Sequence, residues 1–164
     1  MKKGIIIPLL MGGVYIGGKR MLISVYGFSV SEFQGQIDYL SYGVLTRLGR
    51  FRTIYGKRVE ISPAPGSIKR FASGSIDHDS GNGVDVMLPE CKSLAELAQA
   101  QKTAFDAGFE AVGIYPDWRP FMGLHLGFRP SREKNHASWG ALKVDGVQKY
   151  MSAAEALANR GYYA

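Results

Sequence analysis

The sequence contains a single cysteine, Cys91, among its 164 residues. One cysteine excludes an internal disulfide and a cysteine-rich zinc site. Any metal in this protein must therefore be held by histidine, aspartate or glutamate side chains. A chain of this length can bury a core without cross-links, so the lack of disulfides is compatible with one stable domain.

Long hydrophobic runs are also missing. The uncharged apolar stretch Gly4–Gly18 is shorter than the roughly 20 residues that span a bilayer as a helix, and Pro8 and several glycines disfavour a helix further. Its length suits the apolar core of a signal peptide, but no small-x-small cleavage site follows it. Two interpretations stay open. Residues 1–26 form a signal-like or membrane-associated segment that contacts membrane or virion proteins, or Ile5–Ile7 and Met21–Val25 are buried strands of the domain.

The chain has a formal net charge of +6, and its basic residues are scattered rather than gathered in one tract. A basic surface favours polyanionic partners, which include nucleic acid, acidic lipid and the bacterial cell wall. The sequence has neither a pair of RNA-binding aromatic motifs nor a helix with the polar face of a DNA reader, which argues against nucleic acid. Without repeats or a linker, residues 27–164 are expected to form one domain.

Hydrophobic periodicity predicts helices over Ser29–Gly56, Ser93–Gly108 and Ser152–Asn159. Ser93 followed by Glu96 is a capping box, and Gly56 and Gly108 are typical helix ends. Short apolar or alternating segments predict five strands: RVEISP, GVDVML, EAVGIYP, GLHLGFRP and SWGALKV. We therefore expect a small α+β domain with a central antiparallel sheet flanked by helices.

Three polar residues in this pattern are candidate metal ligands. In GVDVML, Asp85 faces away from the hydrophobic layer formed by the valines on either side of it. His78 lies in the glycine-rich stretch SIDHDSGNGVDV, and His125 lies inside the strand GLHLGFRP. Two imidazoles and a carboxylate are the set that a catalytic zinc uses when its fourth position stays open. The alternative is that these are solvated loop residues and one core histidine with a satisfied partner.

The same residues carry a resemblance to a known family. Ser75 and the segment HDSGNGVD resemble the S-x-x-H-x-x-G-x-A-x-D signature of zinc peptidoglycan peptidases related to D-alanyl-D-alanine carboxypeptidases, with Gly83 in place of the alanine. Hedgehog and lysostaphin are distant kin of that family. FSVSEF, LGRFRTIYGKRVEIS, GIYPDW, GLHLGFR and SWG also resemble family segments in family order, so the similarity runs from about Phe28 to the C-terminus.

The resemblance implies a small α+β fold and a zinc ion held by His78, Asp85 and His125. It also implies hydrolysis of peptide bonds in peptidoglycan stem peptides, in a phage virion, as in endolysin-like proteins, or in the bacterial periplasm or cell envelope. Arg70 would correspond to the arginine that holds a substrate carboxylate or carbonyl, although PAPGSIKR departs from the S-G-Y-R-S form of the family.

The sequence departs from the family most clearly beside His125. The family has an acidic residue two positions after this histidine or three positions before it, where this chain has Gly127 and Met122. Candidate substitutes for the missing base are Asp117, Asp79 and His136. Without that carboxylate we expect an attenuated enzyme whose activity rises in Gly127→Asp. The alternative is a virion structural or wall-binding protein that retains a degenerate peptidase fold.

Overall fold

The computed structural model describes residues 11–16, 19–70, 75–132 and 136–159. Its main element is a six-stranded sheet with the strand order β4-β5-β7-β6-β8-β9. The strands are β4 (Glu60–Ile61), β5 (Gly83–Met87), β6 (Ala111–Tyr115), β7 (Gly123–Gly127), β8 (Ala137–Val144) and β9 (Val147–Met151). Only the β6–β8 pair of this sheet is parallel. The expected α+β fold with a mostly antiparallel sheet is confirmed.

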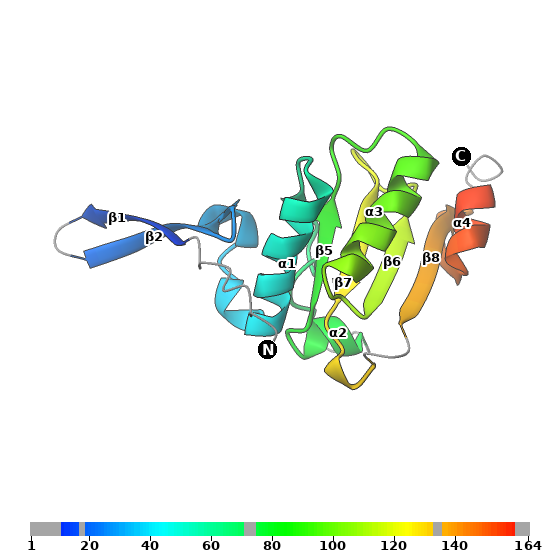
Figure 1. The fold of residues 1–164 in the computed structure, drawn as a ribbon. Helices are drawn as coiled ribbons and strands as arrows, with labels where there is room; N and C mark the ends of the chain where they lie inside the picture. The colour runs from blue at the N-terminus through cyan, green and yellow to red at the C-terminus, as the bar shows by residue number, and fades with distance from the viewer. Residues whose placement is uncertain (1–10, 17–18, 71–74, 133–135, 160–164) are drawn as a thin grey trace, which may run out of the picture.

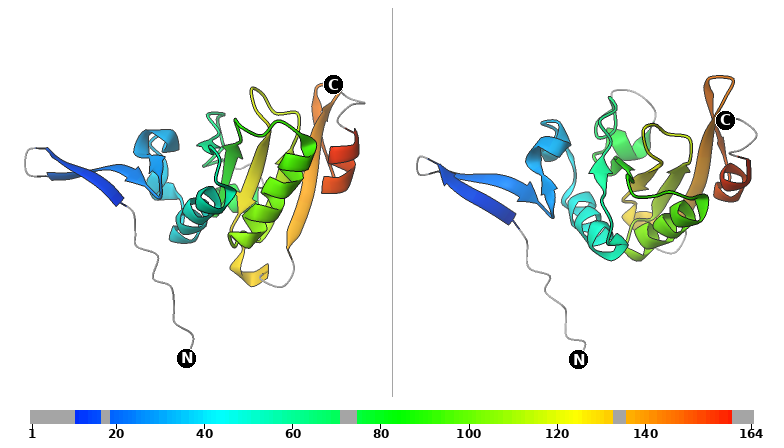
Figure 2. Two further views of the ribbon diagram at one scale, coloured as in Figure 1. Left: turned by 45° about the horizontal axis from the view of Figure 1, so that its top comes forward. Right: turned by 90° about the horizontal axis from the view of Figure 1, so that it is seen from above.

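Helices lie on both sides of this sheet. They are α1 (Tyr42–Tyr55), α2 (Ile76–Asp79), α3 (Leu94–Asp106) and α4 (Ala153–Asn159). Figures 1 and 2 show α1 and α3 side by side across one face, α4 next to β8, and the single turn α2 on the opposite side. Of the helices that the structure describes, α1 and α3 cover one face of the sheet and the short α2 lies on the other.

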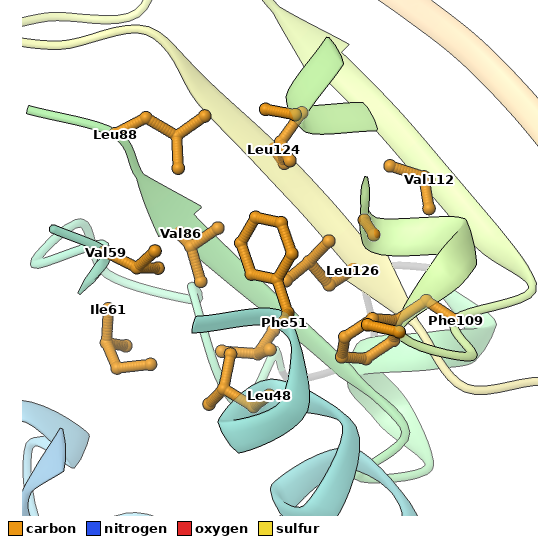
Figure 3. Close-up of a cluster of buried hydrophobic side chains, with 14 of the residues drawn as sticks. Leu48, Phe51, Val59, Ile61, Val86, Leu88, Phe109, Val112, Leu124 and Leu126 are labelled. Carbon is orange, nitrogen blue, oxygen red and sulfur yellow. The ribbon is translucent and has the colours of Figure 1, made fainter. Parts of the chain in front are cut away.

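The covered face contains the hydrophobic core. Figure 3 shows Leu48 and Phe51 of α1 against Val86 of β5 and Leu126 of β7, and all four side chains are buried. Because successive strand residues point to opposite faces, this packing directs Asp85 to the other face of the sheet. The alternation predicted for GVDVML is thus confirmed.

The helix predicted over Ser29–Gly56 is divided into three pieces. Two 3-10 turns, η1 (Val30–Phe33) and η2 (Ile37–Tyr39), precede α1. Gln34 and Gly35 have positive φ angles of 54° and 72°, which no right-handed helix accommodates. Ser29 caps the first turn, as expected, but Ser41 caps α1. Helical periodicity in the sequence therefore continued past a break in the backbone.

The N-terminal part forms a second, three-stranded antiparallel sheet. Its strands are β1 (Met11–Ile16), β2 (Lys19–Val25) and β3 (Phe28–Ser29). The β1–β2 hairpin extends away from the six-stranded sheet (Figure 1). β2 covers Met21–Val25 in this separate sheet, whereas Ile5–Ile7 lies outside the described residues. None of the helices described here is long and apolar enough to cross a membrane.

Leu126→Ala tests how strongly the covered face stabilises the fold. This side chain is fully buried, so its truncation is expected to lower the free energy of unfolding by about 2–5 kcal/mol through lost apolar burial and the cavity left behind. Urea denaturation measures the change. Val147→Ala on β9, where the residue is 61% exposed, is the control and should change stability by less than about 0.5 kcal/mol. Equal effects of the two substitutions would contradict this core.

Candidate metal centre

His78, Asp85 and His125 meet on the face of the sheet opposite the core. Asp85 on β5 and His125 on β7 are direct register partners, and α2 brings His78 to the same place. Nε2 of His78 lies 3.3 Å from Oδ1 of Asp85, Nδ1 of His125 lies 2.9 Å from that oxygen, and the two nitrogens are 3.1 Å apart. The expected convergence of these three residues is confirmed.

The glycine-rich segment between His78 and Asp85 makes this meeting possible. Gly81 has a φ of +71°, and a Cβ atom there would lie 2.2 Å from the carbonyl oxygen of Tyr39. The Gly81 carbonyl in turn accepts a hydrogen bond from the backbone N–H of Ser41. A larger residue would force the turn away from the chain that leads into α1. The turn allows the backbone to leave α2 and enter β5 with both ligands facing each other.

The outer nitrogen of each histidine has its own acceptor. Nδ1 of His78 lies 3.0 Å from the carbonyl oxygen of Ile68, and Nε2 of His125 lies 2.9 Å from Oδ2 of Asp77. These acceptors assign the proton of each neutral imidazole to its outer nitrogen. The inner nitrogens then present lone pairs to Asp85, so three acceptor atoms face one another. Such an arrangement can hold a cation at its centre.

The group fits a metal ion in spacing as well as in chemistry. Ligands about 2.0–2.2 Å from a tetrahedral ion are about 3.4 Å apart, close to the three distances measured here. His78, Asp85 and His125 are all buried, so their donor atoms are shielded from bulk water. The buried His78–Asp85–His125 group can therefore hold a metal. Imidazole and carboxylate suit zinc and other divalent transition metals.

An arginine pairs with each buried carboxylate of the site. Nη2 of Arg70 donates to Oδ2 of Asp85 at 2.8 Å. Arg129 donates from Nε and Nη2 to the two oxygens of Asp77 at 2.7 and 2.8 Å. Paired guanidinium groups offset the cost of burying two negative charges side by side. The arginines also fix the carboxylates in orientation.

The pKa values reflect these contacts. Burial raises the pKa of Asp77, but hydrogen bonds from His125 and Arg129 outweigh burial and lower it to about 2. The pKa of Asp85 is likewise held well below its usual range by His125 and His78, against the effect of burial. Burial lowers the pKa of His125, but its bonds to Asp77 and Asp85 raise it overall. In metal-free protein these bonds favour the protonated form of His125.

A pocket of about 390 Å³ opens beside the group. His125 and Asp77 line it from the buried side. Its other lining residues include two arginines and three aromatic side chains: Arg70, Arg129, Tyr115, Trp139 and Tyr150. The pocket runs from β7 across β6 and β8 to β9, because these strands are neighbours in the sheet. A ligand of several atoms can therefore reach the group.

Arg70 lies at the site, but the substitutes considered for the base do not. Asp117 does not line the pocket, and its carboxylate accepts a hydrogen bond from the backbone N–H of Lys143 near the end of β8. It lies beyond the end of β6, four residues past the level where that strand pairs with His125. His136 stacks on Phe105 of α3 instead. The position of Asp117 therefore gives no support to its role as the base.

The exposed position of Asp79 contrasts with the burial of its neighbour Asp77. Sequence reasoning missed Asp77, which is the carboxylate hydrogen-bonded to His125. The expectation that His125 lacks such a partner is therefore wrong. The only signal in the sequence is that Asp77 directly precedes a candidate ligand. Its contact with His125, 48 residues away, depends on the tertiary fold.

The space around Gly127 argues against the expected benefit of Gly127→Asp. A Cβ atom at Gly127 would lie 2.6 Å from Oδ2 of Asp77 and 3.0 Å from Cβ of Ala111. Both distances are too short to be accepted without movement. The single substitution would crowd an existing carboxylate and add a like charge, so it is expected to weaken the site.

Comparisons of the chain with protein-family models, with curated proteins and with solved structures found no match. The fold and site define an α+β domain with a buried His/Asp/His group that can hold a metal. What this group does is inferred from its geometry and chemistry.

The pKa shifts predict how pH affects the metal-free protein. The raised pKa of His125 gives stability that is fully present below its ordinary value of 6.5 and is lost as pH rises through the higher folded value. The lowered pKa of Asp77 gives stability that is present above 3.8 and is lost as pH falls towards about 2. The contribution of this cluster is therefore greatest between about pH 4 and 6.5.

Urea unfolding in the presence of a chelator, at pH 5.5 and 8.5, measures this effect. The wild-type protein is expected to lose stability at the higher pH, and His125→Gln should lose less. His136→Ala is the control, because His136 lies outside the cluster. This variant should show the same change in unfolding free energy between pH 5.5 and 8.5 as the wild type. Identical pH dependence of wild type and His125→Gln would contradict the raised pKa.

Proposed function

We propose that this protein is a zinc-dependent hydrolase that cleaves peptide bonds in peptidoglycan stem peptides. The observation that carries the proposal is the meeting of three acceptor atoms, at 2.9 to 3.3 Å from one another, beside an open pocket. Zinc, when bound, supplies a Lewis acid that activates water and polarises a carbonyl. With three protein ligands, one position stays open for chemistry.

The protein's own residues would hold and orient the reacting groups. The carbonyl of Ile68 and the guanidinium of Arg70 restrain His78 and Asp85 from outside. Arg70 also lines the pocket, with its side chain about 35% exposed. We therefore assign it two tasks, which are to orient Asp85 and to attract a carboxylate or carbonyl of the substrate.

The choice of peptidoglycan as substrate rests on three features. The first is the resemblance of Ser75 and HDSGNGVD to the peptidase signature, together with the ordered segments that follow. The second is the net charge of +6, which favours an anionic polymer. The third is a pocket with arginine and aromatic side chains rather than a purely apolar lining. A phage virion or a bacterial cell envelope is the setting that fits this substrate.

A second candidate is a virion structural or wall-binding protein that retained the peptidase fold. One specific observation favours it. In the part of the chain that the structure describes, Asp77 is the only carboxylate that lines the pocket, and both of its oxygens bind Arg129. A general base typically contributes about 10² to 10⁴ in rate. Turnover without one would be slow or absent, as expected of a protein that only binds the wall.

Murein turnover distinguishes the two candidates. We expect zinc-loaded full-length protein to release peptides slowly from purified murein, and chelation and His78→Ala to reduce release at least tenfold because either removes the metal site. His136→Ala is the matched control, since it removes an exposed histidine outside the site, and it should keep wild-type activity. The products are quantified by chromatography and mass spectrometry.

Other results would reject the hydrolase. Zinc binding with no product release, together with co-sedimentation with murein, would favour the wall-binding protein. Equal product release by wild type and His78→Ala would show that the activity does not use this site.

A further inference from the structure

We propose that Asp77 is the positioning residue of His125, and that this chain supplies from the His78 side the carboxylate that it lacks on the His125 strand. The inference rests on the metal site of the proposed function. It assigns a role to a residue that neither the sequence motif nor the ligand set includes.

The geometry places His125 between two carboxylates. On one edge of the ring, Nδ1 lies 2.9 Å from Oδ1 of Asp85, and on the other, Nε2 lies 2.9 Å from Oδ2 of Asp77. A ring held at both nitrogens cannot rotate about its side-chain bonds without losing one contact. Asp77 therefore fixes the plane of the imidazole in which Nδ1 points at the metal position.

Asp77 is itself held firmly enough for this task. Its side chain is about 3% exposed, and Arg129 binds both of its oxygens in a fork. The backbone carbonyl of Asp77 also accepts a hydrogen bond from the N–H of Asn82, at 2.8 Å. A bidentate arginine restrains both position and orientation of a carboxylate. Asp77 is thus a fixed acceptor for the outer N–H of His125.

Two glycines leave the room that Asp77 occupies. A Cβ atom at Gly83 would lie 2.7 Å from Cβ of Asp77, and one at Gly127 would lie 2.6 Å from its Oδ2. Both positions depart from the pattern that the sequence resembles, in which an alanine and an acidic residue are usual. One buried side chain accounts for both departures, because either larger residue would overlap it.

The chemical consequence is a defined tautomer. Because Nε2–H is donated to Asp77, Nδ1 keeps the lone pair that a metal needs. The carboxylate also raises the basicity of Nδ1, which makes it a stronger metal ligand. Asp77 acts through His125 rather than on the reacting water, since the imidazole ring separates its bonded oxygen from the metal-facing nitrogen. Outer partners of this kind typically contribute about 10- to 100-fold in metal affinity.

Relocating the carboxylate tests the inference. Zinc Kd is measured by competition with a chromophoric chelator in four full-length proteins: wild type, Asp77→Ala, Gly127→Asp and the double variant Asp77→Ala/Gly127→Asp. Asp77→Ala should weaken zinc binding by about 10- to 100-fold. Gly127→Asp alone should also weaken it, because its carboxylate meets Asp77. In the double variant the new side chain no longer meets Asp77, although its Cβ still lies 3.0 Å from Cβ of Ala111. Its carboxylate can then approach Arg129, and affinity should recover by up to about tenfold relative to Asp77→Ala.

If Asp77 positions His125, the effect of Gly127→Asp on zinc affinity must change sign between the two backgrounds. The same substitution at Gly127 must harm the wild-type protein and help the Asp77→Ala protein. The visible absorption spectrum of the cobalt(II) form gives a second readout, which should shift in Asp77→Ala and return towards wild type in the double variant. A purely structural Asp77 would give additive losses and no spectral recovery.

Glu110→Gln is the matched control. Glu110 is also a buried carboxylate paired with an arginine, Arg47, and its Oε2 accepts the backbone N–H of Arg129. Because it does not contact the histidines, its substitution should lower thermal stability without changing zinc Kd. Asp77→Asn, which keeps the side-chain volume, replaces Asp77→Ala if the alanine variant does not fold, and it should also weaken zinc binding.

The outcomes separate this inference from the proposed function. Zinc Kd within threefold of wild type in folded Asp77→Ala or Asp77→Asn would overturn the role of Asp77, even if wild type hydrolyses murein. The expected pattern of Kd values without murein hydrolysis would support Asp77 and reject the peptidase. Failure of the wild-type protein to bind zinc or cobalt would overturn both.

Discussion

The pairing of Asp85 with His125 across β5 and β7 is the contact on which the site depends. Because the two residues are register partners, the hydrogen bonds of the sheet set the distance between them. Their flanking residues Val84 and Leu126 point the opposite way into the core. Packing of α1 against that core therefore fixes the register, and the register fixes two of the three candidate ligands. A shift of one residue would exchange these faces.

Charge pairing explains how this polar group is tolerated inside the protein. Two buried carboxylates would repel each other, and each would be destabilised by loss of water. Arg70 binds Asp85 and Arg129 binds Asp77, while His125 bridges the two. The result is a continuous polar network in which every carboxylate has a positive or hydrogen-donating partner. Both arginines also line the pocket, so the same side chains that support the group face any ligand that enters.

Holding a metal and catalysing hydrolysis make different demands on this structure. A metal site needs donor atoms at the right spacing and outer partners that orient them, and His78, Asp85, His125 and Asp77 meet those conditions. Hydrolysis also needs a proton acceptor within reach of the activated water. Asp77 is committed to His125 and Arg129, and Asp117 lies beyond the end of β6. Whether the protein is a slow enzyme or a wall-binding protein therefore depends on groups other than the metal ligands.

The sequence by itself determined the central strands, the helix that follows Ser93, and the three residues His78, Asp85 and His125. Periodicity and motif spacing are local, and they report which face of a strand a residue occupies. The sequence did not reveal the break at Gln34 and Gly35, because the apolar spacing continues across it. It also led to the expectation that His125 had no carboxylate partner. Only the tertiary structure showed that Asp77 contacts His125 and that Asp117 lies outside the pocket. Both results depend on which distant segments the sheet places side by side.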